Sequence, residues 1–212
     1  EYIRQQGKYP VIFLTFKDVK EQSWENARQK ILRLIQKEFL RHDRLLTGTH
    51  LKTEERKYFE RIINLTAEQS AYEDGLALLS QFLANEHNQK AILLIDEYDT
   101  PIQAGYVNGY YAEVIGFMRN FLSAGLKDNS YLEKGVLTGI MRVAKESIFS
   151  GLNNLEVFTL LNHDFSDKFG LTEEEVTHLL EAFSLQERRH DVSAWYNGYQ
   201  FGDHIIYNPW SI

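Results

Sequence analysis

The sequence contains no cysteine and no long apolar run. With zero cysteines among 212 residues, disulfides, cysteine-ligated zinc sites and a cysteine nucleophile are excluded. Proteins of reducing compartments rarely contain disulfides, so this composition fits the cytoplasm. No apolar stretch approaches the roughly 20 residues that a membrane-spanning helix needs, and no signal peptide is visible. We therefore expect a cytoplasmic protein without a membrane segment.

The sequence also has fewer basic than acidic residues. The chain has 23 basic and 30 acidic residues, which gives a net charge of −7. Overall charge therefore gives no reason to expect a nucleic-acid partner. Lysines and arginines gather within residues 28–44, but such a run is more typical of a solvated helix face. The seven histidines show no spacing typical of zinc ligands, so no zinc site is predicted.

What the sequence does contain is the balance of a globular protein. Hydrophobic residues make up 43% and charged residues 25%, which argues against disorder. The length suits one domain, or one domain with a small appendage. The sequence starts at Glu1 without an initiator methionine and ends at "NPWSI" without an obvious stop. We therefore expect an excerpt from a longer protein.

Apolar strands alternate with amphipathic helices along the chain. Strands are predicted at 9–16, 91–95, 133–139 and 155–161, and helices at 24–46, 54–64, 66–85, 109–127, 142–150 and 173–183. This alternation predicts an α/β fold, with a parallel sheet flanked by helices on both faces. We expect the α/β core to cover residues 1–162 and a small, mainly helical lid to cover residues 163–212. The aromatic residues between 195 and 210 are expected to form a lid core packed on the α/β core. The alternative is a recognition surface for a base or a peptide.

The stretch "AILLIDEYDT", residues 91–100, places acidic residues directly after a buried strand. Ligands bind at the carboxyl ends of strands in open parallel sheets. Asp96 could hold Mg²⁺ there, largely through water, and Glu97 could activate a water for attack on a phosphoryl group. Four or five apolar residues before Asp-Glu form the Walker B pattern of P-loop ATPases. The alternative is a strand that simply ends at the surface in acidic residues.

The next strand, within "GVLTGIMRVAK", adds polar and basic residues at the corresponding end. Thr138 lies where ATPases of this architecture place a polar residue that contacts the γ-phosphate or the attacking water. Arg142 follows closely and could pair with phosphate oxygens through its guanidinium. The alternatives are a turn cap for Thr138 and a surface ion pair for Arg142. The same two interpretations apply to Lys145.

Several long stretches together resemble one known family. These are "ILLIDEYDTPIQAGYVNGYY", "LEKGVLTGIMRVAKESIFSGLNNLEVFTLL" and "WYNGYQFG" with "IYNPWSI", preceded by "YPVIFLTFKDVKEQSWENA". They are similar to the bacterial AAA-ATPase-like family, a predicted AAA-ATPase domain often followed by a PD-(D/E)XK nuclease-like domain. The resemblance spans nearly the whole chain. It implies a P-loop NTPase fold of the AAA/STAND type that binds ATP and Mg²⁺, with Asp96 and Glu97 as the Walker B pair.

The phosphate-binding loop of that fold, G-x-x-x-x-G-K-[ST], is missing. The Gly-Lys pair at Gly7 is followed by Tyr9 and has no glycine five residues before it. In the family this loop lies upstream of the strand at 9–16, so the resemblance implies truncation at the N-terminus. The strands at 135–139 and 155–161 would then flank an empty slot in the sheet. We expect the 212-residue chain alone to be poorly stable or to aggregate.

Three functional hypotheses remain open. The first is an ATP-hydrolysing enzyme that needs its full-length protein for activity. The second is a nucleotide-dependent switch or scaffold of the STAND kind that regulates an appended nuclease-like effector. The third is a catalytically inactive interaction domain. ATP, further copies in a homo-oligomer and a downstream nuclease-like domain are the partners these hypotheses allow.

A nuclease site within the chain itself is not expected. PD-(D/E)XK chemistry needs an (Asp/Glu)-x-Lys triplet on a strand that neighbours another aspartate. After an apolar strand, only Asp18-Val19-Lys20 has this form, at a frequency that chance explains.

Overall fold

The computed structural model describes residues 2–140 and 155–212, and the chain divides into two compact units. These units are Glu1–Asn153 and Asn154–Ile212. The domain boundary expected between residues 162 and 163 stays a prediction. No helix in the described residues is both long enough and apolar enough to cross a membrane.

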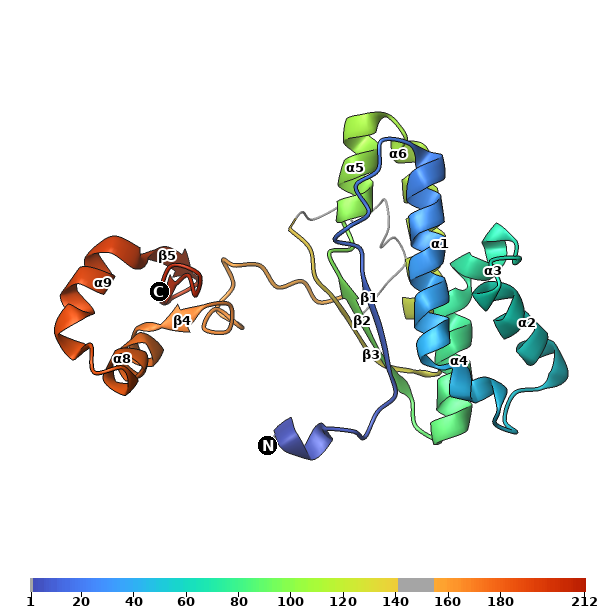
Figure 1. Ribbon diagram of the computed structural model, residues 1–212, viewed down its shortest axis with the longest axis horizontal. Coiled ribbons are helices and arrows are strands. Elements are labelled where there is room, and N and C mark those ends of the chain that lie inside the picture. Colours follow the sequence, from blue (N-terminus) through green and yellow to red (C-terminus); the bar gives the residue numbers. More distant parts are fainter. Residues whose placement is uncertain (1, 141–154) are drawn as a thin grey trace. The chain divides into compact units, whose positions relative to one another are not determined.

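The first unit is built around a parallel three-stranded sheet (Figure 1). Its strands are β1 (Val11–Thr15), β2 (Ala91–Asp96) and β3 (Leu132–Leu137), in the order β1-β2-β3. The register pairs Thr15 with Asp96, so the carboxyl ends of β1 and β2 are level. A parallel sheet with helices between its strands confirms the expected α/β class in its coarse form.

Helices connect the strands of the first unit. They are α1 (Trp24–Arg41), η2 (Asp43–Leu46), α2 (Thr53–Ile63), α3 (Gln69–Glu73), α4 (Gly75–His87), α5 (Thr100–Asn108) and α6 (Tyr111–Leu126). The short helix η1 (Tyr2–Gln5) precedes β1. The helix expected at 24–46 divides into α1 and η2, and the helix expected at 66–85 divides at Asp74. The sequence analysis did not predict α5, which begins directly after the acidic stretch.

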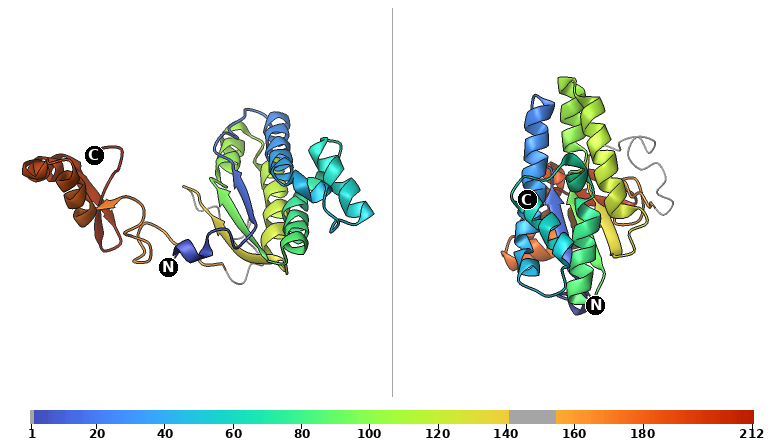
Figure 2. Two further views of the ribbon diagram at one scale, coloured as in Figure 1. Left: turned by 60° about the horizontal axis from the view of Figure 1, so that its bottom comes forward. Right: turned by 90° about the vertical axis from the view of Figure 1, so that its right-hand side faces the viewer.

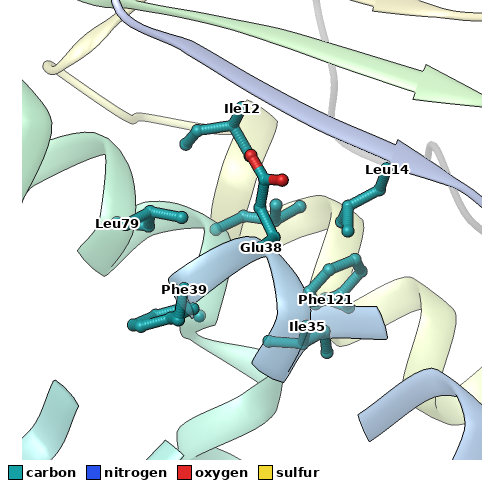
Figure 3. Close-up of a pocket in the computed structure, with 9 residues that line it drawn as sticks. Ile12, Leu14, Ile35, Glu38, Phe39, Leu79 and Phe121 are labelled. Carbon is teal, nitrogen blue, oxygen red and sulfur yellow. The ribbon is translucent and has the colours of Figure 1, made fainter. Parts of the chain in front are cut away.

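The core of this unit lies on one face of the sheet. Helices α1, α4 and α6 pack on that face (Figures 1 and 2). A very small cavity there is lined by side chains of β1 and of all three helices: Ile12, Leu14, Ile35, Leu79 and Phe121 (Figure 3). Burial of such side chains stabilises the fold by about 25 cal/mol per Å² of apolar surface.

The opposite face of the sheet is more open. Phe13 and Val136, which share a register row, are 45% and 42% exposed, and no helix of the described residues covers them. The expectation of helices on both faces therefore does not hold for this part of the chain.

The two edges of the sheet differ. At the outer edge of β1, the buried carboxylate of Glu38 accepts the Phe13 N–H at 2.9 Å, and Arg41 donates to the Val11 carbonyl at 2.5 Å. Arg41 also pairs with Glu38 at 2.6 Å, and Figure 3 shows Glu38 reaching into apolar surroundings. These side chains occupy backbone groups that another strand would need. The other edge of β3 has no partner strand among the described residues.

The strand expected at 155–161 is absent. Residues 155–159 have no regular secondary structure, and the chain turns at 160 and 161. An apolar segment forms a strand only when a neighbour takes its backbone hydrogen bonds. Two strands, at 135–139 and 155–161, were predicted to flank an empty slot in the sheet. The second of these predictions is therefore wrong. The short helix expected at 142–150 lies outside the described residues.

The second unit combines helices with an antiparallel sheet. Its elements are β4 (Leu171–Thr172), α8 (Glu173–Ala182), η3 (Gln186–Arg188), α9 (Arg189–Tyr196), β5 (Asn197–Phe201) and β6 (His204–Tyr207), with strand order β4-β6-β5. Thr172 caps α8 and forms a capping box with Glu175. The unit is therefore mixed, whereas a mainly helical segment was expected.

The aromatic residues of the second unit do not all pack in its core. Tyr207 is buried with Val176 and Leu180, whereas Trp195 and Trp210 are 81% and 97% exposed. Tyr207 thus belongs to a core within the second unit, and the two tryptophans do not. Packing of the aromatic residues against the α/β core stays a prediction. A sequence pattern reports which residues are apolar but not which of them find a partner.

The exposed sheet face and the free edge of β3 lead to a prediction about self-association. We expect the 212-residue polypeptide to associate in solution. Val136→Lys should shift it toward the monomer, because a lysine on an edge strand opposes pairing with another chain. Size-exclusion chromatography with light scattering measures the change.

Leu40→Lys is the matched control. Leu40 lies on α1 and is 45% exposed, close to the 42% of Val136, but it is not part of the sheet. A monomeric parent chain would contradict this prediction, and so would equal effects of the two substitutions.

Candidate functional site

The carboxyl ends of the three parallel strands bring polar side chains together. Asp96 ends the central strand β2, Thr15 ends β1, and Thr138 directly follows β3. Thr15 donates its hydroxyl hydrogen to Asp96 Oδ2 at 2.8 Å, and Thr138 donates to Asp96 Oδ1 at 2.7 Å. One carboxylate is thus held from both sides.

These hydrogen bonds favour the ionised form of Asp96. The bond from Thr138 makes the largest contribution and the bond from Thr15 the next, and both lower the pKa of Asp96 below its ordinary value. Burial raises this pKa, whereas the charge of Lys17 and the Glu97 amide lower it further. Asp96 is therefore ionised near neutral pH. A carboxylate has about four lone-pair sites, so two accepted bonds leave capacity for the waters of a hydrated cation.

Glu97 follows Asp96 in a left-handed backbone conformation. Its φ is 50°, which costs a non-glycine residue on the order of 1 kcal/mol or more. The turn is closed by the Thr100 N–H, which donates to the Glu97 carbonyl at 3.1 Å. The Thr100 hydroxyl also donates to Glu97 Oε2 at 3.0 Å. Both groups of Thr100 therefore hold Glu97, and the side-chain bond orients its carboxylate.

Asp99, the third acidic residue of the stretch, is buried. The residue is only 2% exposed. Its Oδ2 accepts the N–H of Ile140 at 3.1 Å. The N–H of Tyr98 donates to the carbonyl of Thr138 at 3.1 Å. The segments that leave β2 and β3 are thus joined by hydrogen bonds at successive positions.

The sequence-predicted residues divide into three groups. Asp96 and Thr138 are in direct contact, as their positions at strand ends suggested. Glu97 is adjacent, but its carboxylate bonds to Thr100. Arg142 and Lys145 lie outside the described residues, so their roles stay predictions.

Two contributors were missed by the sequence analysis. Thr15 could have been found, because it stands at the carboxyl end of the strand next to β2. Thr100 gave a weaker signal, a hydroxyl three residues after Glu97, where side chains commonly close turns. Within residues 2–140 and 155–212, no three histidine, aspartate or glutamate side chains gather as a metal cage.

The fold and the site define a class: a parallel α/β domain with acidic residues at the carboxyl end of its central strand. Residues 1–149 match the model of the AAA-ATPase-like family, described as predicted AAA-ATPase. This match covers more than half of the sequence, so the chain belongs to that family, which confirms the resemblance. The description of the family names a predicted ATPase.

One relative is a protein of Azotobacter chroococcum mcd 1, described as an uncharacterized protein in the vnfD 5' region. It is 30% identical over 125 residues, which correspond to 58% of this chain and 24% of that protein. The chain thus spans about a quarter of that relative's length. No solved structure matches the chain.

The hydrogen bonds on Asp96 lead to a prediction about its titration. Thr138→Val should raise the pKa of Asp96 toward its ordinary value, and Thr15→Val should raise it less, in the order of the two causes. The pKa of Asp96 is lower in the folded chain than in the unfolded chain. Its contribution to the free energy of unfolding is therefore fully present above the unfolded-state pKa, and it is lost as pH falls through the folded-state pKa. Carbon-13 NMR titration of the carboxyl group measures the change.

Thr49→Val provides the control, because Thr49 is an exposed loop residue away from the strand ends. An unchanged Asp96 titration in Thr138→Val would show that the hydroxyl does not stabilise the carboxylate.

Proposed function

We propose that this chain is part of an ATP-hydrolysing P-loop NTPase of the AAA/STAND type. The observation that supports this most is the ionised carboxylate of Asp96, held by Thr15 and Thr138 at the carboxyl end of the central parallel strand. Ligands bind at this end of open α/β sheets. Family membership supports the same class of activity.

In this proposal Asp96 is the Walker B aspartate and would hold Mg²⁺ largely through water. The residues fit that role: one ionised carboxylate with spare acceptor capacity suits Mg²⁺, which keeps several waters and needs few protein ligands. The absence of a larger acidic cage among the described residues is consistent with this mode of binding. Bound Mg²⁺ would neutralise charge on the phosphates.

Glu97 is the proposed general base. It would orient and deprotonate the attacking water, while Thr138, an exposed residue, would contact the γ-phosphate or that water. Arg142 is a second proposed phosphate contact. The bond from Thr100 holds the Glu97 carboxylate near the strand end without burying it completely.

The proposal needs a phosphate-binding loop, and the 212 residues contain no such motif. We propose that a further segment provides it and pairs with the free edge of β3. Two observations support this edge: Glu38 and Arg41 occupy the outer edge of β1, and Thr138 directly follows β3. A strand added there would end beside Thr138 and Asp96.

Substitution of the proposed base tests the function. In the full-length protein, Glu97→Gln should keep ATP binding and lower turnover by about 10²- to 10⁴-fold, because the amide cannot accept the proton of the attacking water. A steady-state phosphate-release assay and ATP-binding titrations measure the two quantities.

The control is Glu113→Gln, which makes the same chemical change on the exposed surface of α6. Unchanged turnover in Glu97→Gln would exclude the role given to Glu97. ATP binding without measurable turnover in the parent protein would instead favour the nucleotide-dependent switch, in which a non-hydrolysable ATP analogue changes the oligomeric state.

A further inference from the structure

Asp99 is a buried ionisable group that the proposed mechanism does not use. It stands at the N-cap position of α5, where aspartate commonly accepts a backbone N–H of the first helical turn. Here the side chain makes no such bond. Its Oδ2 instead accepts the N–H of Ile140, in the segment that leaves β3. The carboxylate therefore serves a contact between two strand exits and not the helix that it precedes.

The contact is closely packed. A Cβ atom built on Gly139 would lie 2.5 Å from Asp99 Oδ1 and 2.9 Å from Tyr98 Cε1. Real side chains do not approach so closely, so any residue larger than glycine at position 139 would displace the Asp99 carboxylate or the backbone. The glycine thus allows the exit of β3 to lie directly on Asp99.

The position of Thr138 depends on the same segment. Its carbonyl accepts the Tyr98 N–H, its hydroxyl donates to Asp96, and Asp99 bonds to the residue two positions later. Thr138 is therefore fixed on both sides along the chain: by β3 before it and by the Asp99–Ile140 bond after it. Because its side chain is exposed, packing contributes little to holding it there.

We propose that Asp99 is a positioning residue that holds the exit of β3 so that the hydroxyl of Thr138 stays on Asp96. This inference deepens the proposed ATPase function and rests on it where turnover is concerned. Asp99 is not one of the residues proposed to contact ATP, Mg²⁺ or the attacking water. Its effect passes through the backbone of residues 138–140.

Substitutions at Asp99 in the full-length protein test the proposal. Asp99→Ala removes the acceptor, so the N–H groups of both Ile140 and Tyr98 should lose protection in site-resolved hydrogen exchange. Turnover should fall about 10- to 100-fold, the range expected for small misplacements of catalytic groups, with KM for ATP little changed. Asp99→Asn keeps a carbonyl oxygen of the same reach and should restore most of the protection and the turnover.

Gly139→Ala is an independent test that leaves Asp99 in place. The added methyl group should push the carboxylate away and reproduce the effects of Asp99→Ala. Gly116→Ala is its matched control, because Gly116 lies in α6 and a Cβ atom there would meet nothing within 4 Å. If Asp99→Ala does not fold, Gly139→Ala and Asp99→Asn decide the question by the same measurements.

The hydrogen-exchange result separates this proposal from the proposed function. Loss of protection at both Tyr98 and Ile140 supports the positioning role, even if the parent protein proves not to hydrolyse ATP. Loss at Ile140 alone, or unchanged protection at both amides, overturns it. A further outcome applies where the parent protein hydrolyses ATP. If Asp99→Ala removes the protection of both amides but leaves turnover unchanged, the positioning role is also overturned.

Discussion

The carboxylate of Asp96 connects the carboxyl ends of all three strands of the first unit. It accepts one hydroxyl from each neighbouring strand, Thr15 on one side and Thr138 on the other. These bonds orient the carboxylate and lower its pKa, which favours the ionised form. Asp99 adds a second connection one turn further on, through the Ile140 N–H. The candidate site is therefore part of the framework that aligns the strand ends.

The sheet that presents this site is asymmetric. One face is buried beneath α1, α4 and α6, and the outer edge of β1 is occupied by Glu38 and Arg41. The opposite face exposes Phe13 and Val136, and β3 has a free edge within the described residues. Closing one edge and leaving the other free determines where a further strand can add. The free edge is the one next to Thr138.

Strong local patterns predicted much of this arrangement. The continuous apolar strands ending in Asp96 and near Thr138 were located, and their parallel pairing followed from the helices between them. The strand at 155–161 was wrong because an apolar composition does not supply a pairing partner. Helix α5 was missed, since only the turn formed by Glu97 and Thr100 establishes where it begins.

The sequence by itself determined the α/β class, the family and the acidic pair at a strand end, because apolar periodicity and local motifs are properties of neighbouring residues. The tertiary structure decided which distant groups meet. It joined Asp96 to Thr15, 81 positions away, and to Thr138, 42 positions away. It also placed Asp99 against Ile140, 41 positions away. Such contacts depend on strand order and register, which a local pattern does not specify.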